Sequence, residues 1–224
     1  MKKIPMAVVI LSIVLLFTGC ARPYDDGVFH DRQLAQYVQA LLEAGSLRPG
    51  QFDRLTRVEL PPTREISDLA GLERFTNLQA LAIGPGHVTD LSPMASLSKL
   101  EDVRIGRNNI SDLSPLKSVT SPGELSIGGN PIADISPLAA LTGLKIVHLG
   151  ENRIIDVSPL GGLRDLVFLD LSNNRISNIS PLVSLENLQS LDLRGNPLSK
   201  NSIEVCVPQL ESRLGRKVVA FDGD

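Results

Sequence analysis

The chain has 224 residues, of which 42% are hydrophobic and none is tryptophan, and its formal net charge is −3. This length can bury one sizeable core and is compatible with one or two domains. The mildly acidic balance excludes the basic surface on which binding to a phosphate backbone depends, so we expect no nucleic-acid partner.

The first twenty residues have the pattern of an export signal. Lys2 and Lys3 precede an apolar run from Ile4 to Phe17, which ends at Thr18-Gly19-Cys20. A basic start, roughly a dozen apolar residues and a small residue before the cleavage point are typical of a secretory signal peptide. The run is shorter than the about 20 apolar residues that span a bilayer. The sequence therefore predicts a signal peptide over residues 1–19.

The end of this segment, "FTGC", resembles the lipobox of bacterial lipoproteins. Thr18 and Gly19 fit that pattern, whereas Phe17 stands where an aliphatic residue is usual. The resemblance implies that Cys20 is acylated and becomes the first mature residue, which would anchor the protein to a membrane. With Ala21 next, it implies an outer-membrane location in a Gram-negative envelope. The alternative is an ordinary signal peptide with a coincidental cysteine.

Removal of residues 1–19 changes both the charge and the cysteine count. Two lysines and no acid are lost, which leaves 20 basic against 25 acidic residues and a formal charge of −5. If Cys20 carries lipid, Cys206 has no intramolecular partner, so we expect no disulfide framework.

A helical N-terminal cap is predicted over residues 28–54, after a tether over residues 20–27. Leu34, Val38, Leu41 and Leu42 follow the i, i+4, i+7, i+8 spacing of a helix with one apolar face. Asp31 is placed to begin this helix, and Gly45 follows its expected end.

Residues 55–198 repeat one pattern with a period of 22 residues. The pattern is L-x-x-L-x-L-x-x-N-x-L followed by "DLSPL" or a close variant, and it recurs about seven times. The first unit lacks the asparagine and has one extra residue around "LPPTRE". This is the signature of a leucine-rich repeat, in which each unit is one coil of a solenoid and buries its apolar edge against its neighbours.

Each part of the repeat has a physical role. The alternating x-L-x-L-x segment predicts a short strand, and stacked coils place these strands in a parallel sheet on the concave face. The asparagine amide can satisfy backbone groups in the turn. In "DLSPL", Ser114 is expected to cap a short helical turn that begins at Pro115. The predicted fold is an α/β solenoid with short 3-10 or irregular segments on its convex side.

The last segment, residues 199–224, is predicted to be a C-terminal cap made of helix and strand. Ile203, Val207, Leu210 and Leu214 share one helical face, and Pro208 is expected to divide two short helices. "KVVAF", from Lys217 to Phe221, is expected to be a closing strand. Cys206 lies near the apolar face and is expected to be an inert buried thiol.

These features together resemble bacterial internalin-like proteins. The resemblance is carried by "FHDRQLAQYVQALLEAG" before the repeats, by the 22-residue unit with "DISPL", and by "GNPLSKNSIEVCVPQL" after them. It covers nearly all of residues 28–222. It implies an extracytoplasmic or surface module that binds protein, usually through the inner curve of its sheet.

The strand pattern also predicts which side chains face outward. Three columns are expected across consecutive strands: Ala80, Asp102, Glu124, Ile146, Phe168, Ser190; then Ala82, Arg104, Ser126, His148, Asp170, Asp192; then Gly84, Gly106, Gly128, Gly150, Ser172, Arg194. The pair Ile146 and Phe168, flanked by His148 and Asp170, is our candidate for the centre of a protein-binding site. Asp102, Arg104, Glu124 and Asp192 are expected to add charge complementarity. Tight curvature accounts for the glycine column, although bare backbone could also admit the main chain of a partner.

Other functions remain open at this point. Ser126, His148 and Asp170 have the chemistry of a nucleophile, a base and an orienting acid, but an open sheet offers no evident oxyanion hole, so we do not expect an enzyme. A metal site at His148, Asp170 and Asp192 is disfavoured because Arg194 is expected to pair with Asp192, and no motif indicates a cofactor. A glycan or peptidoglycan binder would normally show more aromatic residues than Phe168. A purely structural envelope role is a further alternative, and we expect a monomer.

Overall fold

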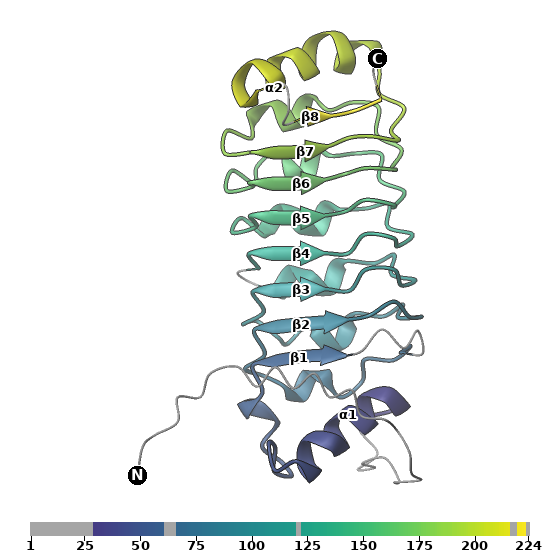
Figure 1. Cartoon of the computed structure of the whole chain (residues 1–224), viewed down its shortest axis with the longest axis vertical. Helices are drawn as coiled ribbons and strands as arrows, with labels where there is room; N and C mark the ends of the chain where they lie inside the picture. The colour runs from purple at the N-terminus through teal and green to yellow at the C-terminus, as the bar shows by residue number, and fades with distance from the viewer. Residues whose placement is uncertain (1–28, 61–65, 120–121, 216–218, 223–224) are drawn as a thin grey trace.

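The computed structural model describes residues 29–60, 66–119, 122–215 and 219–222. The predicted signal peptide, Cys20 and the tether lie outside the described residues. The described chain forms a stack of coils whose eight strands make one parallel sheet in sequence order (Figure 1). The strands are β1 (Arg57–Leu60), β2 (Ala80–Ile83), β3 (Asp102–Arg104), β4 (Glu124–Ser126), β5 (Ile146–His148), β6 (Phe168–Asp170), β7 (Ser190–Asp192) and β8 (Val219–Ala220).

The register of the sheet follows the repeat period. From β2 to β7, each strand residue pairs with the residue 22 positions later on the next strand, as Ala80 does with Asp102. Arg57 of β1 pairs with Ala80, which is 23 positions later and confirms the extra residue in the first unit. The first two predicted columns are therefore in register from β2 to β7, although Ala80 is buried.

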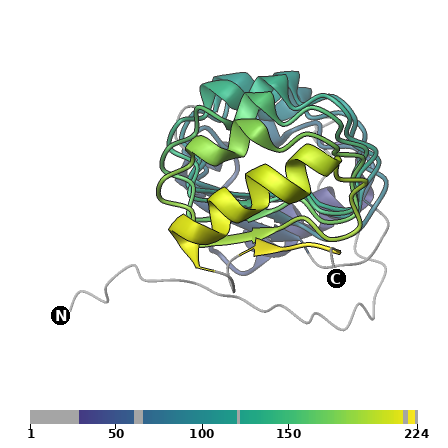
Figure 2. The ribbon, with the colours of Figure 1, turned by 90° about the horizontal axis from the view of Figure 1, so that it is seen from above.

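Short helical turns form the side of each coil opposite the sheet (Figure 2). Most of them begin at the Ser-Pro of a repeat. They are η1 (Phe52–Arg54), η2 (Leu72–Arg74), η3 (Ser92–Met94), η4 (Ser114–Ser118), η5 (Ser136–Ala140), η6 (Ser158–Leu160) and η7 (Ser180–Ser184), all 3-10 helices.

The expectation that Ser114 caps its turn is wrong. Ser114 is the first residue of η4, and it is Asp112 that satisfies its polar groups. Asp112 Oδ1 accepts the Ser114 N–H at 2.8 Å, and Oδ2 accepts the hydroxyl at 2.8 Å. A carboxylate two residues earlier can reach both donors, and therefore the aspartate of "DLSPL" has the local role that the sequence predicts for the serine.

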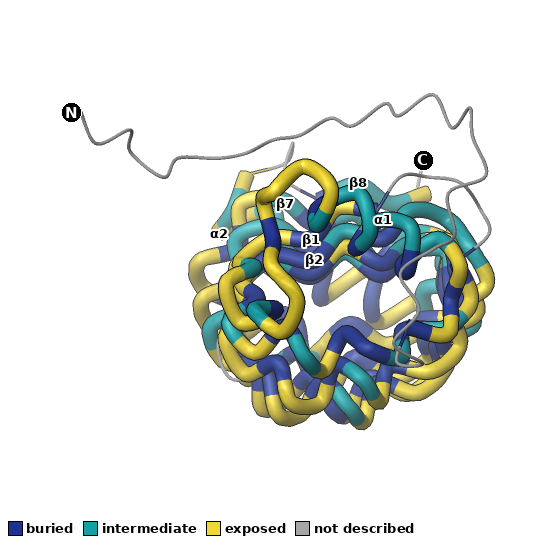
Figure 3. Tube along the Cα trace, turned by 90° about the horizontal axis from the view of Figure 1, so that it is seen from below, coloured by how far each residue is buried: buried dark blue, intermediate teal, exposed yellow. Residues whose placement is uncertain are grey.

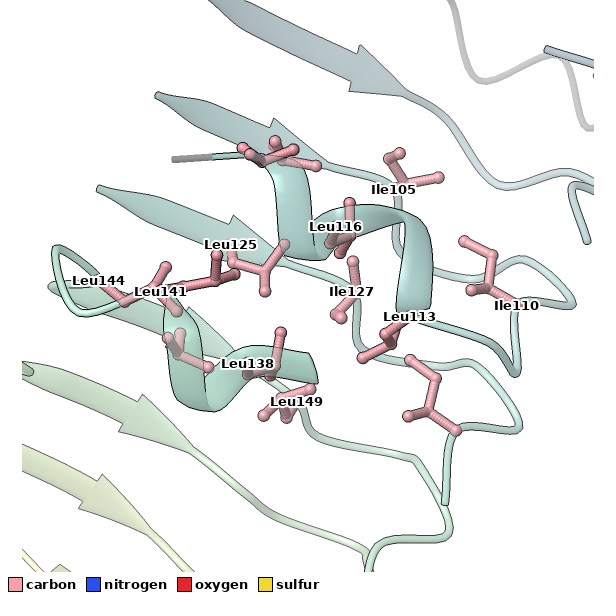
Figure 4. Close-up of a cluster of buried hydrophobic side chains, with 14 of the residues drawn as sticks. Ile105, Ile110, Leu113, Leu116, Leu125, Ile127, Leu138, Leu141, Leu144 and Leu149 are labelled. Carbon is pink, nitrogen blue, oxygen red and sulfur yellow. The ribbon is translucent and has the colours of Figure 1, made fainter. Parts of the chain in front are cut away.

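The core lies inside the coils, between the sheet and the helical turns. Each coil contributes aliphatic side chains from its strand, from the turn after the asparagine and from its helical turn (Figure 4). Leu125 and Ile127 of one coil meet Leu138 and Leu141 on its opposite side, and all four are at most 1% exposed. Seen along the stack, the buried residues line the inside and the exposed residues the outside (Figure 3). Each coil thus needs its neighbours for burial.

The repeated asparagines complete the coils from within. Asn152 is a buried example, 8% exposed. Its Oδ1 accepts the N–H of Ile132 in the preceding coil, and its Nδ2 donates to the carbonyls of Ile127 and Leu149. This confirms the expected role of the asparagine, because these backbone groups lie away from water and need partners.

The N-terminal end is covered by α1 (Arg32–Glu43), which Figure 1 shows at the base of the stack. Asp31 caps this helix as predicted, accepting the N–H groups of Gln33 and Leu34. Below the first coils, the rings of Phe29, Phe52 and Phe75 pack together with centroids 5.6 to 5.9 Å apart.

The C-terminal end is covered by a helix and by β8. Pro208 does not divide two helices, because a π-helical turn, η8 (Ser202–Cys206), continues directly into α2 (Val207–Leu214). The Val207 N–H donates to Ser202 O, and this wider turn accommodates the proline ring at the start of α2. Cys206 is 2% exposed, as expected of a buried thiol.

The predicted fold class is therefore confirmed: an open solenoid with a parallel sheet, short 3-10 turns and a helical cap at its C-terminus. No helix in the described part of the chain is long and apolar enough to cross a membrane.

Candidate functional site

The candidate site is the solvent-facing side of the sheet, which we call the sheet face. Two columns of side chains run across it from coil to coil. The candidate residues come from β3 (Asp102, Arg104), β4 (Glu124), β5 (Ile146, His148), β6 (Phe168, Asp170) and β7 (Asp192).

An aromatic platform occupies the middle of the sheet face. The rings of His148 and Phe168 lie on adjacent strands with centroids 4.7 Å apart and planes tilted by 40°. Ile146 pairs with Phe168 in the same register. Ile146 and Phe168 are half-buried rather than fully exposed as the sequence indicated, and the imidazole of His148 packs against the Phe168 ring. The platform consists of Ile146, His148 and Phe168.

Asp170 lies beside this platform and is held in place by Ser172. Its Oδ1 accepts the Ser172 N–H at 2.9 Å and the Ser172 hydroxyl at 2.7 Å. Its Oδ2 lies 4.0 Å from His148 Nδ1, which is too long for a hydrogen bond. The platform therefore has one fixed acidic neighbour.

A second group on the sheet face is charged and internally paired. Arg104 donates to both carboxylate oxygens of Glu124, at 3.0 and 3.1 Å. Its Nε also lies 3.0 Å from Asp102 Oδ1. Burial raises the pKa of Asp102 above its ordinary value, and the Arg104 guanidinium opposes that shift. Asp102, Arg104 and Glu124 thus form one ion cluster across β3 and β4.

The last candidate residue, Asp192, pairs with a neighbour that follows its own strand. Arg194 donates its Nε to Asp192 Oδ1 at 3.0 Å, as the sequence led us to expect. The hydrogen bond from the Arg194 side chain holds the pKa of Asp192 below its ordinary value. Within the described residues, no group of three or more His, Cys, Asp and Glu side chains is arranged to hold a metal ion.

Ser126, His148 and Asp170 do stand in one register column on β4, β5 and β6. Among the described residues, however, no hydrogen bond joins Ser126 to His148. Asp170 directs its Oδ1 to Ser172 instead of orienting the imidazole. The column therefore lacks the linked donor and acceptor pairs on which nucleophile activation depends.

A shallow groove of about 590 Å³ runs along the C-terminal ends of the strands, from β2 to β6. Its floor is the glycine column. A Cβ on Gly128 would lie 2.9 Å from the carbonyl oxygen of Gly150, and one on Gly106 would lie 3.1 Å from that of Gly128. Close stacking of the coils is therefore a sufficient reason for these glycines, and it leaves bare backbone at the bottom of the groove.

Two charged residues on the rim of this groove were not among the sequence candidates. Arg107 and Glu151 line it and are exposed. Both have a left-handed backbone, with φ of 57° and 58°, whereas the equivalent position is glycine at Gly129 and Gly195. The sequence does contain a signal for them. The position immediately before each repeated asparagine is glycine in some coils and a charged or polar residue in others, and we call these equivalent positions a row.

Comparisons with known proteins agree with the fold. Residues 164–204 match the family model described as leucine-rich repeats in two copies. A comparison with curated proteins finds no match.

Solved structures are similar to this chain over a larger part of its length. An internalin from Listeria monocytogenes matches with 29% identity and a TM-score of 0.64, over 81% of this chain and 61% of its own. This chain thus spans about three fifths of that protein's structure. Internalin C2 of the same species matches with 25% identity and a TM-score of 0.61, over 83% of this chain and 92% of its own. A leucine-rich repeat protein from Leptospira interrogans shares the fold at 20% identity and a TM-score of 0.62, over 77% of this chain and 50% of its own. The chain therefore has the leucine-rich repeat fold, and its structure is similar to those of internalins.

Proposed function

We propose that this is an exported, lipid-anchored protein of the bacterial cell envelope that binds another protein through its sheet face. The contact is centred on the platform and on Asp170, and the ion cluster and Asp192 lie at its edges. The protein acts as a binding module and not as an enzyme, it uses no cofactor, and it works as a monomer.

The observation that carries this proposal is the platform. His148 and Phe168 present a packed pair of rings in the middle of an open sheet, with a fixed carboxylate beside them. Rigid aromatic groups surrounded by polar ones are the usual anchors of protein interfaces, because they bury a large area with little loss of side-chain entropy. Short strands in a continuous sheet hold these side chains at fixed positions.

The surrounding charges orient the partner on the sheet face. Arg104 is held by Glu124 and Asp102, and Asp192 by Arg194, so these groups keep defined positions before a partner arrives. Charges at the edge of an interface act mainly on orientation and association rate. The platform would supply most of the affinity.

Export and anchoring rest on the sequence of residues 1–20. The basic start, the apolar run and the "FTGC" ending support a lipoprotein signal with Cys20 as the acylated residue. In cells grown with a radiolabelled fatty acid, we expect label in the wild-type protein and none in Cys20→Ser. Equal labelling of both proteins would remove the anchor from the proposal.

Cross-linking and affinity capture from the native envelope test the binding face. We compare the wild-type protein with Phe168→Glu and with Ile155→Glu. Ile155 is 61% exposed and lies outside the sheet, so the control introduces the same charge at another apolar surface position. A partner captured by wild type and Ile155→Glu but lost with Phe168→Glu is the expected result. Equal capture by all three proteins would exclude the platform as the contact, and binding to purified cell-wall glycan alone would replace the protein partner with a carbohydrate.

A further inference from the structure

We propose that the groove beside the platform takes an extended polypeptide segment that carries an acidic and a basic residue about three positions apart. This inference rests on the proposed function, because the segment would belong to the protein that binds the sheet face. Beyond the proposed function, the inference specifies the conformation and the charge pattern of the partner segment that enters the groove.

The floor of the groove fits a main chain lying across the strands. Gly106 and Gly128 come from consecutive coils and present half-buried backbone, whereas Gly150 in the next coil is buried beside the side chains of Asp170 and Ser172. Ser126 and His148 stand along one side of this floor, and Arg107 and Glu151 along the other. Backbone without side chains, between two rows of polar groups, lets the main chain of an extended segment approach closely.

The rim charges have no evident role in folding. In Arg107 and Glu151 the backbone adopts a conformation that glycine accepts at lower cost, and glycine stands at the equivalent positions of two other coils. Within the described part of the chain, neither side chain takes part in an ion pair, whereas Arg104 and Asp192 on the same face do. The left-handed backbone is common to this row, Asn173 with φ 52° included, so Arg107 and Glu151 are distinguished by an exposed charge at the rim of the groove that forms no ion pair with the described residues.

The charges differ in sign along the groove. Arg107 lies in the coil of β3, and Glu151 lies two coils further on, with Gly129 between them. Asp170, which also lines the groove, adds a second negative charge at the Glu151 end. A uniformly anionic polymer would be attracted at one end and repelled at the other, whereas a segment with both charges is complementary along its whole length.

The spacing of the rim charges sets the spacing of the motif. Neighbouring strands lie about 4.8 Å apart, so two coils separate Arg107 and Glu151 by roughly 10 Å. An extended chain of the polyproline II type advances about 3.1 Å per residue with three residues per turn, so side chains three positions apart lie on the same side and roughly 10 Å apart. The acidic residue would face Arg107, and the basic residue would face Glu151.

Selection of displayed random twelve-residue peptides on the full-length protein tests this pattern. We expect enrichment of peptides in which an acidic and a basic residue are three positions apart. A synthetic peptide of that type should bind about ten-fold more weakly to Arg107→Glu and to Glu151→Arg than to the wild type. Arg153→Glu and Glu186→Arg carry the same charge changes outside the groove lining, and they should leave the affinity unchanged.

Selection on the Arg107→Glu variant separates recognition from a structural effect. We expect the enriched acidic residue to be replaced by a basic one at the same separation, while the thermal unfolding of the variant stays that of a folded protein. An unchanged motif, or no enrichment at a separation of three, would overturn the inference. If Phe168→Glu still abolishes partner capture in that case, the proposed function stands and only the groove segment is wrong.

Discussion

Asn130 Oδ1 accepts a hydrogen bond from the backbone N–H of Asn108, the equivalent residue of the preceding coil, at 3.2 Å. The same oxygen accepts the Ile110 N–H at 3.0 Å, and Asn130 Nδ2 donates to the carbonyls of Ile105 and Ile127. Each asparagine thus closes the turn of its own coil and satisfies donors in the one before. Folding of one coil therefore depends on the presence of the next, as expected for a solenoid with nearest-neighbour coupling.

Replacement of a central asparagine should be costly. Asn152→Ala leaves the buried Ile132 N–H without its acceptor, whereas the carbonyls of Ile127 and Leu149 each keep a second donor, from Asn130 and Asn174. An unsatisfied buried N–H costs about 1–3 kcal/mol, so we expect the free energy of unfolding to fall by about 2 kcal/mol. Urea denaturation measures the change. Asn196→Ala is the matched control near the C-terminal end, where the asparagine is only half-buried, and it should lose less. Equal losses would contradict the dependence on burial.

The register of the sheet could be predicted from the sequence because it is set by spacing. Val103, Leu125 and Val147 are the equivalent inward residues of consecutive strands, at intervals of 22 positions, and every outward residue is then assigned by alternation. Local hydrogen bonds were less predictable. Serine and aspartate in "DLSPL" can both cap a turn, and the choice depends on the backbone path before η4, which the pattern of apolar residues does not determine.

In the candidate site, too, the positions of residues could be predicted from the sequence, but the contacts between their side chains could not. The column that contains Ile146 and Phe168 follows from periodicity, but the diagonal contact of Phe168 with His148 depends on side-chain rotamers. Arg107 and Glu151 were not among the predicted site residues. Both have a positive φ, and residue type alone does not reveal that conformation.

The left-handed backbone at Glu151 should make glycine the more stable residue there. We expect Glu151→Gly to raise the free energy of unfolding by about 0.5–1 kcal/mol, because relief of the steric strain exceeds the added entropy of the unfolded chain. Thermal and urea denaturation measure this change. Arg153→Gly is the control: that residue has no positive φ, and its replacement should destabilise the protein. A loss of stability in Glu151→Gly would show that the glutamate side chain itself supports the fold.

A row of aspartates should make the protein sensitive to acid. The N–H and hydroxyl groups of Ser114, Ser136 and Ser158 lower the pKa of Asp112, Asp134 and Asp156. A carboxylate with a depressed folded pKa stabilises the fold above its unfolded pKa, about 3.9, and this contribution is lost as the pH falls through the folded value. We therefore expect the free energy of unfolding to drop as the pH decreases below about 4.

Asparagine replacements test the origin of that drop. In a later coil of this row, Asn178 Oδ1 already accepts the Ser180 N–H at 3.0 Å, so an amide can occupy the position. The triple variant Asp112→Asn, Asp134→Asn, Asp156→Asn should stay folded at pH 7 and show a flatter decline of stability in acid. If its acid denaturation curve has the same shape as that of the wild type, other carboxylates control acid unfolding.

Removal of Arg104 should alter the titration of its neighbour. Burial raises the pKa of Asp102, the Arg104 charge opposes this shift, and the Glu124 charge adds to it. In Arg104→Ala the main opposing charge is gone, so we expect the pKa of Asp102 to move further upward, as measured by carboxyl-carbon NMR. A raised folded pKa favours the protonated folded state, and its stabilising contribution is lost as the pH rises through that value. The variant should therefore lose more stability relative to wild type at pH 7 than at pH 3. Arg153→Ala removes an equivalent charge that does not act on Asp102, and an Asp102 titration that is unchanged in both variants would show that Arg104 does not control this carboxylate.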